Sequence, residues 1–227
     1  MMEVNLIAYT PSPDWVCAKA AGICTRKGPS VKALRAAMKS GHTSVIEHAS
    51  FTFEIRGISR VTLAQLTRHR HASYSVESQR YNRIEDLAAC SVVPESFARC
   101  GIDVRPLLGE LQHMYEMLIE AGVPREDARY VLPEGTSTSL ILTMNARELL
   151  HFFSLRCCNR AQWEIRELAC RMRILCRSAA PELFKRSGAP CQCGQVCPEI
   201  HPCGHPLGAP MLEHLDEAEE EPDHDED

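Results

Sequence analysis

The sequence lacks several features that would assign a class of protein at once. It holds no apolar stretch close to the roughly 20 residues that a membrane-spanning helix needs. Its first ten residues, MMEVNLIAYT, have neither the basic segment nor the apolar core of a signal peptide, so we expect a cytoplasmic protein with no membrane partner. The patterns G-x-G-x-x-G and G-x-x-x-x-G-K-[ST] are both absent, so side chains must hold any nucleotide that binds.

Aromatic side chains and long basic clusters are also scarce. The 227 residues include 2 Trp, 5 Tyr and 6 Phe, and no stacking motif is visible. Proteins that bind single-stranded nucleic acids place such aromatics beside a basic groove. We therefore expect no nucleic-acid partner, and a zinc-bearing nucleic-acid binding protein is kept only as an alternative function.

The net charge of −5 conceals two oppositely charged parts. Ten of the 30 acidic residues lie in residues 213–227, which contain no Lys or Arg. The other 212 residues therefore carry 25 bases against 20 acids. This mildly basic body suits anionic ligands, and the acidic, low-complexity tail is expected to be disordered.

Twelve cysteines are many for a chain without a secretory signal, and they favour thiols or metal ligands over disulfides. Eight are scattered through residues 17–176, and most of these are expected to be small buried hydrophobes. That expectation includes the adjacent Cys157 and Cys158. The other four crowd together with His201 and His205 near the end, and they are Cys191, Cys193, Cys197 and Cys203. This group could hold a tetrahedral Zn²⁺, but C-x-x-C pairs are absent, so free thiols or a redox role stay open.

Hydrophobic spacing and turn residues predict an α+β fold, with mixed helices around a central, largely antiparallel sheet. A helix through residues 61–70 is expected to follow an N-cap at Ser59, with Val61, Leu63 and Leu66 as its buried apolar stripe. A helix stop and a new start are expected at residues 122–126. The expected strands are 4–9, 51–55 and 139–144, and the expected helices are 31–40, 61–70, 107–120, 146–155 and 161–176. Residues 71–83 are expected to be a loop, and the Cys/His-rich residues 187–210 are expected to be irregular.

The run Arg68-His69-Arg70 ends one predicted helix and is followed by a loop rich in Ser, Arg and Tyr. Guanidinium groups bind phosphates and planar carbonyl groups through paired hydrogen bonds. Hydroxyls and backbone N–H groups of loops also suit phosphate. The run therefore indicates an anion site that could hold a flat heterocycle, although an isolated triplet of this kind is more often a solvated helix end.

The longer pattern R-H-R-x-x-S followed by S-x-R-Y resembles the signature of flavin-dependent thymidylate synthases. Here it spans residues 68–81, and further segments agree in order and spacing: Gly41–His48, Phe51–Phe53, Gly122–Pro133 and Asn145–Ile165. The resemblance covers roughly residues 4–185. It implies a catalytic domain over residues 1–188, followed by a Cys/His-rich segment at 189–212 and the tail at 213–227.

The resemblance implies reductive methylation of dUMP to dTMP by a homotetramer with active sites at subunit interfaces. Methylenetetrahydrofolate would supply the carbon, FAD would carry the hydride and NADPH would supply it. Carried over by position, the flavin contacts are His42, Ser44, Arg68, His69, Arg70, Asn145, Arg147 and His151. The dUMP contacts are Gln65, Arg68, Ser78, Gln79, Arg80, Arg129 and Arg156. Arg156 is the expected catalytic residue, because its guanidinium can stabilise ionisation at N3 of the uracil.

Several positions depart from the family pattern. Ser75 and Val76 stand where many members have Asn and Glu, and Val76 cannot supply a carboxylate. His151 and Arg160 stand where some members have Asn and His, but both can still donate hydrogen bonds. These departures leave open a member that binds flavin without turnover.

Overall fold

Four antiparallel strands form the centre of the fold in the computed structural model, which describes residues 2–24, 26 and 28–205. Their order across the sheet is β1-β2-β4-β3, and each neighbouring pair is antiparallel. The strands are β1 (Glu3–Tyr9), β2 (Ser50–Ser59), β3 (Ala72–Val76) and β4 (Ser137–Asn145). The expected α+β class with an antiparallel sheet is confirmed.

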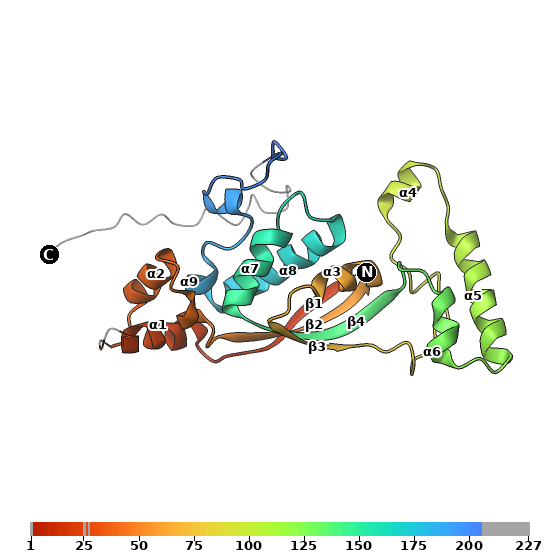
Figure 1. Ribbon diagram of the computed structural model, residues 1–227, viewed down its shortest axis with the longest axis horizontal. Helices are drawn as coiled ribbons and strands as arrows, with labels where there is room; N and C mark the ends of the chain where they lie inside the picture. The colour runs from red at the N-terminus through yellow and green to blue at the C-terminus, as the bar shows by residue number, and fades with distance from the viewer. Residues whose placement is uncertain (1, 25, 27, 206–227) are drawn as a thin grey trace.

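One face of the sheet carries the main hydrophobic core. Phe51, Phe53 and Ile55 of β2 are fully buried, and the residues between them are only partly covered. In β4 the same alternation buries every second side chain, including Leu142 and Met144. Period-two burial of this kind is typical of an antiparallel sheet that is covered on one face. The helices on that face are α3 (Arg60–Leu66), α7 (Ala146–Arg156) and α8 (Trp163–Ala179) (Figure 1).

The two ends of the sheet carry different helical additions (Figure 1). The end nearer α7 carries α1 (Pro13–Cys24), α2 (Val31–Lys39), the 3₁₀ turn η1 (Thr43–Ile46) and α9 (Pro181–Phe184). The other end carries a helical arm of α4 (Glu95–Arg99), α5 (Arg105–Glu120), α6 (Arg125–Ala128) and the 3₁₀ turn η2 (Arg129–Val131). The arm has its own small hydrophobic cluster, which includes Leu87, Leu108 and Tyr115. None of the helices in the described residues is both long and apolar enough to cross a membrane.

Most of the elements expected from the sequence are confirmed, and three expectations are wrong. Residues 71–83 contain strand β3, in which Ala72, Tyr74 and Val76 pack on the core while Ser73 and Ser75 are exposed. The helix expected through residue 70 ends at Leu66. Ser59 does cap it by accepting the Thr62 N–H, but Thr62 is buried where Val61 was expected, and Val61 is 40% exposed.

The Cys/His-rich segment follows α9 and lies beside the end of α7. It contains the short 3₁₀ turn η3 (Pro190–Cys193) and is otherwise irregular as far as residue 205, as expected. The acidic tail at 213–227 lies outside the described residues.

Candidate functional site

A cavity of about 300 Å³ lies where the turn between α3 and β3 meets α7. Its lining comes from two stretches that are about 80 residues apart in the chain, and consists of Arg68, His69, Arg70, His71, Glu148, His151, Leu155 and Arg156. Four of the eight predicted flavin contacts, Arg68, His69, Arg70 and His151, are thus brought together with the predicted catalytic residue, Arg156.

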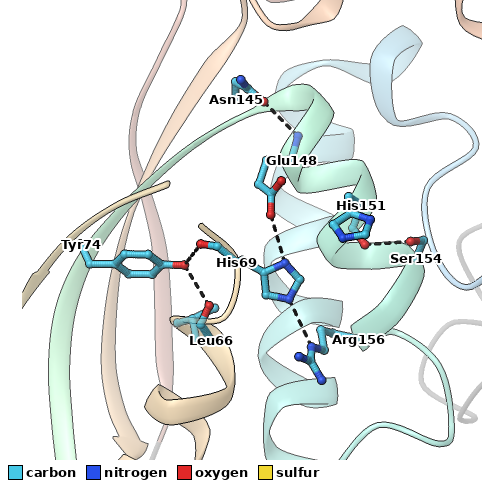
Figure 2. A network of polar contacts seen from close by, with 8 residues as sticks. All are labelled: Leu66, His69, Tyr74, Asn145, Glu148, His151, Ser154 and Arg156. Atoms are coloured by element: carbon cyan, nitrogen blue, oxygen red, sulfur yellow. Dashed lines mark hydrogen bonds and ion pairs between the residues drawn. The ribbon is translucent and has the colours of Figure 1, made fainter. Parts of the chain in front are cut away.

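His69 lies at the centre of a short chain of polar contacts (Figure 2). Its ring is 4% exposed, with Nδ1 3.1 Å from Glu148 Oε1 and Nε2 3.2 Å from Arg156 Nε. A guanidinium can only donate, so Nε2 must accept and carries no proton. Nδ1 therefore carries the proton and donates it to the Glu148 carboxylate. The two neighbours together fix the tautomer of His69, and the ring fixes the position of the Arg156 guanidinium.

The surroundings of His69 hold its ring neutral. Burial lowers the pKa of His69 from its ordinary value of 6.5, the hydrogen bond to Glu148 opposes this shift, and the charge of Arg156 adds to it. The pKa of Arg156 is itself lowered by burial and by the nearby charge of Arg68. At neutral pH the ring that joins Glu148 to Arg156 is thus a neutral imidazole.

Two further contacts hold this chain in place (Figure 2). The Tyr74 hydroxyl on β3 lies 2.9 Å from the Leu66 carbonyl and 2.7 Å from the His69 carbonyl, so it closes the turn that presents His69. Burial raises the pKa of Tyr74 to about 12, which keeps the hydroxyl a donor. The Asn145 side chain accepts the Glu148 N–H at 2.9 Å and so caps α7.

The charge of the cavity favours an anion. Three guanidiniums, from Arg68, Arg70 and Arg156, line it against the single carboxylate of Glu148, whose charge already faces His69. Among the described residues the terminal nitrogens of Arg156 have no hydrogen-bond partner, because only Nε is used. They remain available to a planar carbonyl or imide edge, to which a guanidinium can donate two parallel hydrogen bonds.

The other predicted flavin contacts lie on α7 and around η1. Arg147 is one helical turn before His151 and forms an ion pair with Glu47 at 2.5 Å. His42 is the cap residue of η1, and Ser44 lies within that turn, which contacts α7. Asn145 is at the start of α7, where its side chain is used as a cap. These residues do not line the cavity itself.

Most of the predicted dUMP contacts form a second group beside the helical arm. Arg80 forms an ion pair with Glu126 at 2.6 Å, and Arg129 Nε donates to the Glu126 carbonyl at 3.0 Å. Ser78 Oγ accepts the Arg80 N–H at 3.2 Å, and the neighbouring Gln79 is buried. None of these residues lines the cavity around His69. Gln65 lies on α3, one residue before its end.

Sequence reasoning missed Glu148 and Tyr74. The spacing Asn145-x-x-Glu148 is a capping-box pattern that predicts a helix start, and Glu148 does occupy the third helical position. Nothing in that pattern shows that its carboxylate reaches a histidine 79 residues earlier. Tyr74 was missed because residues 71–83 were expected to form a loop. The contact of its hydroxyl with the turn before β3 depends on the position that the strand gives it.

The tentative zinc ligands are not assembled as expected. Across residues 2–24, 26 and 28–205, no group of three or more His, Cys, Asp or Glu side chains is arranged to hold a metal ion. Cys193 Sγ lies 3.7 Å from the Gly188 carbonyl, whereas Cys191, Cys197 and Cys203 line a different, small cavity.

The proteins that match this chain in sequence or structure have names that refer to thymidylate synthesis or to methylation of UMP and dUMP. A family model described as "Thymidylate synthase complementing protein" matches residues 5–182. The chain is 45% identical over 213 residues to a "Flavin-dependent thymidylate synthase" of Geobacter sulfurreducens, covering 87% of this chain and 91% of that one. It is 42% identical over 204 residues to a protein of the same name from Saccharolobus solfataricus, covering 84% and 78%. Among solved structures, the UMP/dUMP methylase PolB from Streptomyces cacaoi bound with 5-Br dUMP matches with a TM-score of 0.70 and 29% identity, covering 82% of this chain and 93% of that one.

Proposed function

The chain belongs to the family of flavin-dependent thymidylate synthases, and from this premise we propose that it methylates dUMP reductively to dTMP. In this proposal methylenetetrahydrofolate is the carbon donor, FAD is the hydride carrier and NADPH is the reductant. The observation that carries it is the cavity in which the Arg68-His69-Arg70 run meets His151 and Arg156.

The residues around this cavity suit a flavin dinucleotide. Arg68, Arg70 and Arg147 are cations that can face its phosphates. Arg68 and Arg70 line the cavity, and Arg147 lies on α7. Arg147 is exposed, and within the described part of the chain it pairs only with the exposed Glu47, so a ligand phosphate can compete for it. The further flavin contacts in the proposal are His42, Ser44, His69, Asn145 and His151. When bound, the flavin supplies the hydride that completes the new methyl group.

Arg156 acts on the uracil by charge. Its free terminal nitrogens can donate to the imide edge of the uracil and stabilise negative charge at N3, which raises electron density at C5, the carbon that receives the methyl group. A fixed cation of this kind needs to be held in place before the substrate binds, because orientation at the moment of reaction costs free energy. The contact with His69 provides that orientation.

The remaining dUMP contacts support a site built between copies of the chain. Ser78, Gln79, Arg80 and Arg129 lie beside the arm, beyond β3 from the cavity, so one chain does not bring both groups together. Gln79 is buried, yet its Nε2 has no partner within the described residues, as expected for a donor that serves a ligand. The arm also exposes apolar side chains that suit burial against a second copy, including Tyr130 (84% exposed), Met114 and Met117. We therefore include a homotetramer with shared active sites in the proposal.

Two alternative functions can be distinguished from the proposed one by the colour and the activity of the purified protein. A member that binds flavin without turnover would be yellow but inactive, and the absence of a carboxylate at Val76 keeps it in view. A zinc-bearing nucleic-acid binding protein would be colourless.

A cytoplasmic location is also part of the proposal. It agrees with the cysteines, because all twelve lie within the described residues and none of them forms a disulfide.

The experiment that tests the proposal starts with the visible spectrum of the purified protein. NADPH, methylenetetrahydrofolate and dUMP are then added without oxygen. We expect a flavin band that bleaches with NADPH and returns only when both dUMP and the folate are present, together with dTMP. A colourless protein that takes up no added FAD and makes no dTMP would refute the proposal, and a yellow protein that makes no dTMP would select the first alternative.

A further inference from the structure

A larger cavity lies at the end of the sheet nearer α7, where α2, η1, α7 and α9 meet residues 185–195 (Figure 1). Its volume is about 690 Å³, which falls in the range of roughly 300–1,000 Å³ that is typical of sites for small molecules. The wall from residue 185 onward lies beyond residue 182, where the match to the family model ends. The shared family pattern therefore does not account for this cavity.

Positive charge dominates the lining of this cavity, which we call the basic cavity. Its four cations, against the single carboxylate of Glu182, are Arg35, Lys39, Lys185 and Arg186. Arg35 holds that carboxylate through two hydrogen bonds, of 2.7 and 2.8 Å. In the part of the chain that the structure describes, none of the other three cations forms an ion pair. The charge of the basic cavity therefore favours an anionic ligand.

A further cation, Arg173 of α8, lies directly behind the wall of the basic cavity. It is 5% exposed, and its guanidinium lies so close to Gly188 of the lining that a Cβ atom there would come within 2.6 Å of Nη1. Within the described residues its side chain donates one long hydrogen bond, to Gln192 Oε1 at 3.4 Å, while its Nε has no partner and no carboxylate pairs with it. A buried cation without a paired anion is costly. An anion on the other side of Gly188 would offset this charge.

The rest of the lining indicates what kind of anion fits. Met38, Leu150 and Pro190 add apolar surface, and Thr43 adds a hydroxyl group. A bare inorganic ion needs neither apolar contacts nor a space of about 690 Å³. Sites for small organic molecules combine apolar walls with a few charged groups that fix orientation, and lysine and arginine side chains are usual partners of phosphate. The lining therefore suits a nucleotide, whose base and sugar accompany its phosphates.

The basic cavity is separate from the cavity around His69, although both use α7. Leu150 and Ser154 line the basic cavity, whereas His151 and Leu155 line the other one. Successive residues of an α-helix are rotated by about 100°, so the two cavities lie on neighbouring faces of α7. None of the predicted flavin or dUMP contacts lines the basic cavity. It therefore offers room for a further molecule beside the ligands of the proposed reaction.

We propose that the basic cavity binds a nucleotide with at least two phosphate groups, which Lys39, Lys185 and Arg186 face. These three cations exceed the charge of one phosphate monoester, about −2, so a second phosphate is needed to balance them. Met38 and Leu150 contact the nucleoside. Such a molecule has two possible sources, a free nucleoside diphosphate or triphosphate, and the adenosine half of the proposed reductant NADPH. Both present a nucleoside with a pyrophosphate, and the experiment separates them.

The test measures binding by calorimetric titration of the full chain, saturated with FAD and dUMP so that the cavity around His69 is filled. The probes are ADP, NADP⁺, which cannot reduce the flavin, and inorganic pyrophosphate. We expect saturable binding of ADP or NADP⁺ to one site per chain, and weaker binding of pyrophosphate, which makes no apolar contacts. If the protein takes up no FAD, the same titration is made without it. Failure of the proposed reaction therefore leaves this test intact.

Charge reversal at the surface of the cavity locates the site. Lys39→Glu and Arg186→Glu should each weaken nucleotide binding by about tenfold or more, the usual effect of removing a hydrogen bond to a charged group. The matched control is Lys32→Glu, an exposed lysine on the same helix as Lys39 that does not line the cavity, and it should bind as the wild type does. A parallel rise in KM for NADPH identifies the reductant as the ligand, and an unchanged KM identifies a free nucleotide.

Several results would overturn the proposal. They are no binding of ADP or NADP⁺ at millimolar concentration, equal weakening by Lys32→Glu and Lys39→Glu, and pyrophosphate that binds as tightly as the nucleotides. If a variant does not fold, chemical acylation of the wild type still decides. Bound nucleotide should slow the acylation of Lys39 and Lys185, measured by mass spectrometry, and should leave that of Lys32 unchanged. Equal rates with and without nucleotide at all three lysines would exclude the site.

Discussion

Arg156 Nε donates to His69 Nε2 at 3.2 Å, and this contact joins two residues that are 87 positions apart. An arginine side chain has about 2 kcal/mol of rotamer entropy to lose when it is fixed. In this protein the Arg156 side chain is fixed by the buried, neutral ring of His69. The other nitrogen of that ring, Nδ1, is in turn held by Glu148. The histidine of the Arg68-His69-Arg70 run is thus a buried support within the wall of the cavity, while the two arginines beside it are exposed residues of the same lining.

Replacing Arg156 by lysine should lower the turnover of dUMP by about 100- to 1000-fold, the usual cost of removing one fixed donor to developing charge. A lysine keeps the charge, but its single ammonium nitrogen cannot present a planar pair of donors to the uracil edge while a further nitrogen is held by His69. Steady-state kinetics of dTMP formation checks this. The control is Arg99→Lys, an exposed arginine on α4 whose partner is Glu95, and it should leave turnover unchanged. Equal rates for Arg156→Lys and the wild type would remove Arg156 from catalysis.

Glu148 should act as a positioning residue, and two substitutions separate this role from a purely structural one. In Glu148→Gln the amide oxygen can still accept the His69 Nδ1–H, whereas in Glu148→Ala the buried donor is left without a partner. We expect kcat to fall by more than about tenfold in the alanine variant and far less in the glutamine variant, by analogy with groups that orient a catalytic histidine. The two variants are compared by kcat and by KM for dUMP. Equal loss in both would show that the charge of Glu148 matters and not its position.

His69 should make the folded state less stable in acid. Its folded pKa is lowered, so the folded state binds fewer protons than the unfolded state at pH values below about 6.5. Its contribution to stability is therefore complete above the unfolded pKa and is lost as the pH falls through the folded pKa, by about 1.4 kcal/mol for each unit of the shift. Urea unfolding of the wild type and of His69→Gln between pH 7 and pH 4.5 checks this. The variant should show a smaller dependence on pH, and parallel curves would contradict the prediction.

Ser59 should contribute more to stability than an ordinary helix cap. Its N–H and Oγ donate to the buried Glu164 carboxylate at 2.7 and 2.5 Å, and Oγ also accepts the Thr62 N–H. Ser59→Ala leaves part of a buried carboxylate without a donor, and we expect the free energy of unfolding to fall by about 2–3 kcal/mol. The matched control is Ser30→Ala, because Ser30 caps α2 at a partly exposed position and should cost only about 1 kcal/mol. Similar losses in the two variants would show that Glu164 finds other partners.

The elements that the sequence predicted well are those whose local pattern agrees with their burial. Phe51, Phe53 and Ile55 alternate along β2, and Ser59 caps α3, so spacing and capping residues were sufficient. Strand β3 was missed because Ala72, Tyr74 and Val76 are separated by serines in a short segment that is ordered by pairing with β4. The local sequence of β3 does not indicate that it pairs with β4, which begins 65 residues after the start of β3.

The site was predictable only as a list of residues. The order of Arg, His and Ser identified which side chains belong together in the family, but not which of them meet in one chain. The position of His69, buried in the wall of the cavity that Arg68 and Arg70 also line, depends on Glu148, which lies on another element.

If active sites are shared between copies, two inactive variants should restore activity when they are mixed. Arg80→Ala removes a residue beside the arm, and Arg156→Ala removes one from the cavity, and we expect each variant alone to be nearly inactive. In oligomers assembled at random from equal amounts, about a quarter of the shared sites would combine an intact cavity with an intact arm. Co-expression with two different affinity tags, followed by assay of the doubly tagged oligomers, measures this recovery. The control pair is Arg68→Ala with Arg156→Ala, which both line the same cavity of one chain and so cannot restore each other. Recovery in neither pair would mean that Arg80 and Arg156 serve one site within a single chain, or that Arg80 is not part of the site.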